Sequence, residues 1–411
     1  MTITESPELD LLSREFTQDP YAVFARLRSE APAVKLTVKT LATAVQAWVI
    51  TGYDDARRML ADSRLSKNAP ELAGVISRHA VNPDEEITEN PRSMLFSDPP
   101  DHTRLRKLVG KAFTMRRVQA LRPAVEKIVD QALDRLPAGQ EFDFVEEFAL
   151  PVPMAVIGSL LGIPEEAYDD FREWSTALGS VETSMDDKRA VITTAYGYVR
   201  ELIAAKRVRP GDDMISALIA AEDEGVHLTE SEMLSTVFLV MNAGYETTAS
   251  LLSSMLLALL TRPDLREELR AEPGALSAAV EEVLRYESPL NMSTIRFTRE
   301  PVTVGGVTIP ENEIVFVSLC SADRDGTRFE APDAIRLDRA DNGHLAFGHG
   351  IHHCLGAPLA RLEGLVVLER LLHRFSSWEL SVPAESLRWR HSLQFRGLES
   401  LPVRLAEAAG A

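Results

Sequence analysis

Cysteine is nearly absent from this 411-residue chain, which contains only Cys320 and Cys354. Two cysteines cannot form a disulfide framework, and this scarcity indicates a protein of the reducing cytoplasm. A basic leader followed by a short apolar run is also missing, so we do not expect secretion. Because a free cysteine is more often a small buried hydrophobe than a ligand, each has to be judged from its neighbours.

An excess of basic residues is absent as well, since the formal net charge is −18. This argues against non-specific nucleic acid binding, which requires a basic face. The longest apolar run, residues 234–260, approaches the length of a membrane span. Asn242, Glu246 and Thr247 interrupt its middle, and an ionisable group there would be costly in lipid. We therefore predict that this run is the buried central helix of a soluble protein.

No repeat, low-complexity tract or linker divides the sequence, so a single domain over residues 1–411 is predicted. The expected fold class is mainly α with small β-sheets, because helical periodicity dominates. Residues 70–100 are rich in proline and acidic residues and are predicted to form a long irregular loop. Further helices are expected at 20–30, 53–61, 102–113, 118–136, 263–272, 275–286 and 359–375, and several between 151 and 221. Strand character is expected at 34–38, 48–51, 302–309 and 314–319.

The strongest signal is the segment FGHGIHHCLG at residues 347–356. Gly348 and Gly350 let the backbone turn tightly and direct amide N–H groups inward. These donors and the positive end of the following helix favour the thiolate of Cys354, which Phe347 shields from water. Such a thiolate suits one soft bond to iron. A zinc site, a nucleophilic cysteine activated by histidine and a buried structural cysteine are the alternatives.

This segment resembles the haem-binding loop of cytochrome P450 enzymes of the soluble bacterial type, and the likeness extends along nearly the whole chain. The resemblance implies the P450 fold, with a long axial helix over haem b (iron protoporphyrin IX). It also implies a monooxygenase that inserts one oxygen atom from O2 into an organic substrate by hydroxylation or epoxidation. Cys354 would be the proximal iron ligand.

Two further motifs fit the same family. The resemblance implies that Glu282, Arg285 and Arg339 form a buried structural triad that braces the cysteine loop. In the axial helix, Ala243 and Gly244 would lie against the haem. Glu246 and Thr247 would be an acid–alcohol pair that supplies protons during O2 activation, with Thr247 as the catalytic residue. The Thr247 hydroxyl can also bond a backbone carbonyl one turn back.

Haem carries two propionates, which need cationic partners. The resemblance assigns this role to four residues, and adds two haem contacts from the cysteine loop. The propionate set is His102, Arg106, Arg296 and His352, and the loop contacts are Phe347 and Gly348.

The substrate pocket is predicted by analogy alone. Its expected residues come from four parts of the chain: Met94, Leu95, Val240, Met241, Asn291, Met292, Leu393, Gln394 and Phe395. The acidic residues Asp84, Glu85, Glu86 and Glu89 would attract a cationic substrate such as an amino sugar, and a solvated loop face is the alternative. The family context suggests a secondary metabolite, such as a polyketide, macrolide, terpenoid or peptide.

Electrons have to come from outside, because the sequence has no flavin or ferredoxin segment. We expect an acidic ferredoxin and its NAD(P)H-dependent reductase as donors. The candidate docking residues are Arg104, Lys107, Lys111, Arg116 and Arg361. A peroxide-driven oxygenase and a non-catalytic docking module are the rival hypotheses, but the chain keeps the acid–alcohol pair and the cysteine that such proteins tend to lose.

The chain departs from the family pattern at a few positions. It reads Ala322-Asp-Arg-Asp-Gly326 where relatives usually have Asn and Pro, and Ile335 and Arg336 replace a common Phe-Asp pair. These departures put local loop geometry in question rather than catalysis. Tyr245, beside Glu246, is expected to alter the distal pocket.

Overall fold

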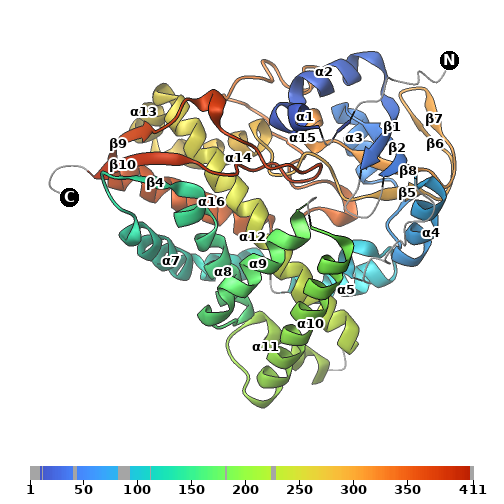
Figure 1. Ribbon diagram of the computed structural model, residues 1–411, viewed down its shortest axis with the longest axis horizontal. Coiled ribbons are helices and arrows are strands. Elements are labelled where there is room, and N and C mark those ends of the chain that lie inside the picture. The colour runs from blue at the N-terminus through green and yellow to red at the C-terminus, as the bar shows by residue number, and fades with distance from the viewer. Residues whose placement is uncertain are drawn as a thin grey trace.

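The computed structural model describes residues 10–11, 13–39, 44–81, 93–111, 113–180, 183–223 and 228–407. Over these residues the chain is mainly helical with small β-sheets (Figure 1), as the sequence predicts. The acidic segment 84–89 lies outside the described residues. Within them, no helix is both long enough and apolar enough to cross a membrane.

The helices surround one long central element. They are α1 (Arg14–Gln18), α2 (Pro20–Glu30), α3 (Tyr53–Leu60), α4 (Ala69–His79), α5 (Asp101–Gly110), α6 (Met115–Ala120), α7 (Arg122–Arg135), α8 (Pro151–Leu161), α9 (Tyr168–Gly179), α10 (Met185–Val208), α11 (Met214–Asp223), α12 (Glu230–Thr261), α13 (Pro263–Ala271), α14 (Leu276–Tyr286), α15 (Leu319–Ala322) and α16 (Ala357–Arg374). Two short 3-10 turns, η1 (Met94–Phe96) and η5 (Gly350–His352), lie near the candidate site.

The strands form a larger sheet and two smaller ones in the described part of the chain. The larger has the order β1 (Ala33–Lys39), β2 (Ala44–Ile50), β8 (Ile314–Val317), β5 (Arg296–Thr298) and β3 (Leu65–Ser66). A second joins β4 (Glu141–Asp143), β10 (Pro402–Glu407) and β9 (Phe375–Leu380), and a hairpin pairs β6 (Val302–Val304) with β7 (Val307–Ile309). Figure 1 shows the larger sheet at one side of the molecule and helices α7 to α11 at the other.

The central helix α12 begins and ends close to the predicted limits. The Thr229 hydroxyl accepts from the N–H of Glu232 and the Glu232 carboxylate accepts from the N–H of Thr229, a reciprocal cap that fixes the first turn. Most of its side chains are buried, and it packs against α8, α14 and α16. This confirms the prediction of a buried axial helix, and it carries part of the candidate site to the middle of the fold.

Two element predictions were wrong, and proline explains both. Residues 69–79 form α4 and not an irregular loop, because Asn68 caps the helix by accepting from the N–H of Glu71, with Pro70 in its first turn. The helix predicted for 118–136 is two helices, and Pro123 lies in the first turn of the second one, α7. Proline is well tolerated in a first helical turn, so there it marks a start rather than an absence of helix.

Candidate haem site

The cysteine loop enters α16 through a tight turn. Gly348 and Gly350 have φ values of 71° and 77°, the left-handed region that favours glycine. A Cβ at Gly350 would lie 2.8 Å from the carbonyl oxygen of Leu60, so a larger residue would displace the backbone. The N–H of Cys354 donates to the carbonyl oxygen of Phe347 at 2.8 Å, which closes the turn.

Cys354 is exposed, in contrast to Cys320, which is buried. The surrounding protein nevertheless raises the pKa of the Cys354 thiol by burial. The backbone N–H groups of Gly356 and Ala357 and the Arg106 guanidinium lower this pKa but do not outweigh the burial. The loop therefore supplies the predicted donors, and full ionisation calls for a positive partner at the sulfur, such as a metal ion.

The triad residues meet beneath this loop. Arg285 donates to the Glu282 carboxylate from Nε and Nη2 at 2.9 and 2.8 Å, and Arg339 Nε donates to Oε1 at 2.9 Å. The side chains of Glu282 and Arg285 are 1% and 0% exposed. Burial alone would raise the pKa of Glu282, but these arginines lower it. Asn342 Nδ2 and the N–H of Arg336 complete the carboxylate's hydrogen bonds.

The four residues predicted to bind propionates lie close to one another. The rings of His102 and His352 are 4.3 Å apart, and the Nε2 atom of each is buried without a hydrogen-bond partner in the described part of the chain. Arg296 is 4% exposed and bonds the carbonyl oxygen of Thr294. Burial lowers the pKa of Arg296 to about 10, although Asp98 opposes this effect.

A fifth basic side chain, which the sequence analysis missed, joins this cluster. Lys67 is 1% exposed, and its Nζ has no hydrogen-bond partner among the described residues. Burial and the neighbouring Arg296 hold its pKa well below the usual range, against the attraction of Asp98. In the sequence an isolated lysine is indistinguishable from a solvated one, so only its packing could reveal this role.

The buried donors without partners indicate which kind of ligand the site would bind. Orphaned Nε2 and Nζ atoms are costly to bury, and one carboxylate, Asp98, faces Lys67, His102 and Arg296. A ligand with two carboxylates beside a metal that binds Cys354 would satisfy both halves of the site. Within the described chain, no group of three or more His, Cys, Asp or Glu residues could hold a metal ion. Haem fits these residues better than the zinc alternative.

On α12, three residues form an open strip on an otherwise buried helix. Ala243 is exposed, and Gly244 and Thr247 are partly exposed, one turn apart on the same face. The Thr247 hydroxyl donates to the carbonyl oxygen of Ala243 at 2.8 Å, the bond expected from the sequence. The helix is continuous through Gly244. Tyr245 is 1% exposed and packs in the main core cluster, so its effect on the distal pocket stays a prediction.

Glu246 is held by a residue that the sequence analysis did not single out. Its Oε1 accepts from Arg390 Nη2 at 3.1 Å, and the carboxylate is 5% exposed. Burial raises the pKa of Glu246, and Arg390 partly offsets this. A carboxyl with a raised pKa, one residue before Thr247 in the chain, is able to hold and release a proton.

The predicted pocket residues fall into two groups. Asn291 donates its N–H to the carbonyl oxygen of Gln394 at 2.8 Å, and Leu290 and Phe395 form a β-bridge, so these two segments lie side by side. Met292 and Leu393 belong to one apolar cluster. The others, Met94, Val240 and Met241, are in the main core cluster, and Leu95 is partly buried beside them in η1.

The residues at which the chain departs from the family pattern make specific contacts in the structure. Asp323 Oδ1 accepts from the N–H of Leu345, and Arg324 donates to the carbonyl oxygen of Tyr286. Ile335 packs against an apolar cluster, while the N–H of Arg336 donates to Glu282. The loop geometry is therefore supported rather than disrupted.

Comparison with known proteins agrees with this architecture. The family model for cytochrome P450 matches residues 178–389. Cytochrome P450 107B1 of Saccharopolyspora erythraea is 45% identical over 408 residues, 98% of this chain and 99% of that protein. The polyketide biosynthesis cytochrome P450 PksS of Bacillus subtilis is 40% identical over 397 residues, 96% of this chain and 98% of the relative. The tirandamycin C-bound P450 monooxygenase TamI superposes with a TM-score of 0.88 at 42% identity, covering 97% of this chain and 99% of TamI.

The chain therefore belongs to the cytochrome P450 family. It is a haem-thiolate monooxygenase, which transfers one oxygen atom from O2 to an organic molecule. The predictions of family, fold class and reaction are confirmed.

Proposed function

We propose that this chain oxygenates a polyketide or a similarly complex secondary metabolite at haem b bound through Cys354. The buried, unpartnered donors beside an exposed cysteine carry this proposal. The relative named for polyketide biosynthesis and the monooxygenase bound to tirandamycin C support the substrate class. The two cysteines are unpaired, which fits a cytoplasmic enzyme.

In this proposal the buried basic side chains would hold the propionates. The propionate set would be Lys67, His102, Arg106, Arg296 and His352, and Ala243, Gly244, Phe347 and Gly348 would contact the rest of the haem. When bound, haem supplies the iron at which O2 is activated and from which oxygen is transferred.

The chain's own contribution to the reaction is proton supply and substrate placement. Thr247 presents its hydroxyl on the open strip of α12, anchored to Ala243. Once its ion pair with Arg390 opens, Glu246, whose pKa is raised by burial, can take up a proton from solvent and pass it toward Thr247. Asn291 and Met292, with Leu393 to Phe395, would place the substrate carbon near this hydroxyl and exclude water.

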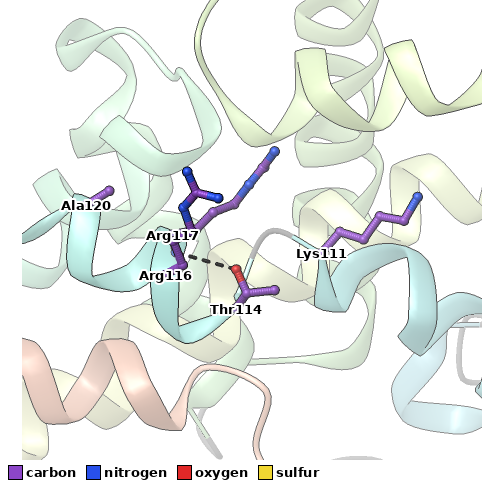
Figure 2. A pocket seen from close by; sticks show the side chains of 5 residues that line it. All are labelled: Lys111, Thr114, Arg116, Arg117 and Ala120. Carbon is purple, nitrogen blue, oxygen red and sulfur yellow. Dashed lines mark hydrogen bonds between the residues drawn. The ribbon is translucent and has the colours of Figure 1, made fainter.

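We further propose that a ferredoxin, reduced by an NAD(P)H-dependent reductase, docks on a basic surface near the cysteine loop. Figure 2 shows the side chains that line a pocket on this surface: Lys111, Thr114, Arg116, Arg117 and Ala120. The pocket has a volume of about 530 Å³. Met115, which is 61% exposed, adds an apolar contact. The pocket lies close to the cysteine loop, because Gly110 faces Leu355. A basic rim around an apolar side chain suits an acidic protein partner.

Two of the predicted docking residues already form ion pairs within the chain. Arg104 pairs with Glu232 and Arg361 pairs with Glu281, so their charges are partly neutralised. Lys107, Lys111 and Arg116 are exposed and have no ion pair with any described carboxylate. Arg117 is the addition that the structure contributes to the predicted set.

The test is the spectrum of the reduced protein with carbon monoxide. The wild type and C320S, which alters the buried cysteine, are expected to give the band of thiolate-ligated haem. C354S is expected to bind haem through the propionate cluster but to lack that band. A thiolate-type band in C354S would contradict the assignment.

A further inference from the structure

The segment that leads into the cysteine loop is fixed residue by residue. Asp323, at the C-terminal end of α15, accepts from the N–H of Leu345 at 2.6 Å. His344 Nδ1 accepts from the N–H of Ala346 at 3.2 Å. Phe347 follows directly, and its carbonyl oxygen accepts from Cys354. Two side chains therefore set the backbone path immediately before the turn that carries the sulfur.

The carboxylate of Glu281 on α14 connects His344 to Arg361 on α16. Glu281 Oε2 lies 3.1 Å from His344 Nε2, and both its oxygens accept from Arg361, at 2.6 and 2.8 Å. The Arg361 guanidinium lies 4.5 Å from the centroid of the Phe347 ring. Burial alone would raise the pKa of Glu281, but Arg361 and His344 lower it to about 2, so this carboxylate stays ionised.

Asp323 differs from Glu281, because its pKa is raised and not lowered. It is 0% exposed, and its Oδ2 has no hydrogen-bond partner in the described chain. The titratable and charged groups that face it are His344 from the loop, Arg285 from α14, Arg324 from its own segment and Cys320 from α15. Arg285 donates to the backbone carbonyl of Asp323 and not to its carboxyl group. Burial raises the pKa of Asp323 to about 7, although His344, the bond from Leu345 and the two arginines lower it.

We propose that Asp323, His344 and Glu281 form a brace that positions the cysteine loop, and that Asp323 makes this brace respond to pH. The inference rests on the proposed function, because it takes Cys354 as the iron ligand. Asp323 is a positioning residue. In its neutral form it places no charge in the core, while its ionised form holds Leu345 more strongly but leaves a buried, charged oxygen without a donor, which favours opening of the loop to water.

The direction of the pH effect follows from the raised pKa. An ordinary aspartate in the unfolded chain ionises near pH ~3.9. The stabilisation from neutral, folded Asp323 is therefore complete below that pH and is lost as the pH rises through about 7. Loosening of the loop is expected on the alkaline side, and not in acid.

The test compares the holoenzyme with D323N, whose amide keeps the shape and the acceptor for Leu345 but cannot ionise. We would measure the thiolate-type fraction of the reduced carbon monoxide complex and the thermal midpoint between about pH 5 and about pH 8. The wild type is expected to lose at least about half of its thiolate-type fraction over this range, and D323N to stay level. D338N, an exposed carboxylate in the preceding loop, should behave as the wild type.

Two further variants keep the proposal testable if D323N does not fold. H344N removes a ring that lowers the pKa of Asp323, so the transition should move to higher pH. E281Q should lower the thiolate-type fraction at every pH. Identical pH profiles for D323N and wild type would overturn the role of Asp323, and a wild-type spectrum in E281Q would overturn the brace. A wild type without a thiolate band at any pH would instead refute the proposed function.

Discussion

The two sides of the candidate haem site are built from different kinds of contact. On the cysteine side, charged side chains from distant segments hold the backbone, as Glu282 does with Arg285 and Arg339. On the α12 side, the ion pair of Glu246 with Arg390 stands among apolar side chains that meet by packing. Charge-assisted hydrogen bonds demand one geometry, whereas apolar contacts tolerate exchanges that conserve volume.

This difference fits the division of work between the two sides. The loop proposed to hold the iron would serve the same chemistry whatever the substrate, so a rigid charged frame is suitable. The substrate side has to match one molecule, and packing contacts can be changed there without disturbing the ligand to iron. The variants below test whether the contrast is real, beginning with the largest effect.

The substitution E282A tests the charged frame, which is formed by Glu282, Arg285 and Arg339. It removes the carboxylate between Arg285 and Arg339 and leaves two guanidinium groups without their partner in a buried site. Breaking a buried pair in this way costs about 3–5 kcal/mol of unfolding free energy. Urea denaturation of the holoenzyme, followed by circular dichroism, would measure it. D338A, which removes an exposed carboxylate, is the control, and equal losses in both variants would refute the contrast.

T247V acts on the α12 side and should spare stability. It keeps the side-chain volume but removes the hydroxyl that bonds Ala243. Loss of a proton-delivering group typically reduces the rate by about 10²-fold or more, so product formation should fall while O2 consumption continues. Product and hydrogen peroxide would be measured for each NAD(P)H consumed. T261V removes the same type of hydrogen bond at the end of α12 and should leave coupling intact.

K67M tests the cation that was found only in the structure. Loss of one buried charged donor should weaken haem binding by about 1.5–3 kcal/mol, or roughly 10- to 100-fold. The rate at which haem passes to an excess of a haem-scavenging protein would measure it. Lys127 is exposed on α7, so K127M should release haem at the wild-type rate. Equal rates for the two variants would remove Lys67 from the propionate set.

The sequence predicts the site residues that lie in short motifs, and misses those that reach the site from distant segments. The segment around Cys354 and the pair Glu282 and Arg285 are short motifs, so their chemistry is visible in one dimension. Lys67 and Arg390 reach the site from segments far from the motifs they support, and an isolated basic residue in a sequence resembles any solvated one. Helix α4 was missed because Pro70 was taken as a breaker and not as a first-turn residue.

The smallest effect should come from the surface, where solvent screens charge. R116E combined with R117E reverses two exposed charges beside the pocket that Lys111 lines, without touching the charged frame. An acidic ferredoxin should then bind about 3- to 10-fold more weakly, and the difference should shrink at high salt. Steady-state rates at increasing ferredoxin concentration would show a higher KM with an unchanged kcat. R404E reverses an exposed charge on β10 and serves as the control. If R404E weakens the interaction as much, net charge and not this pocket guides the ferredoxin.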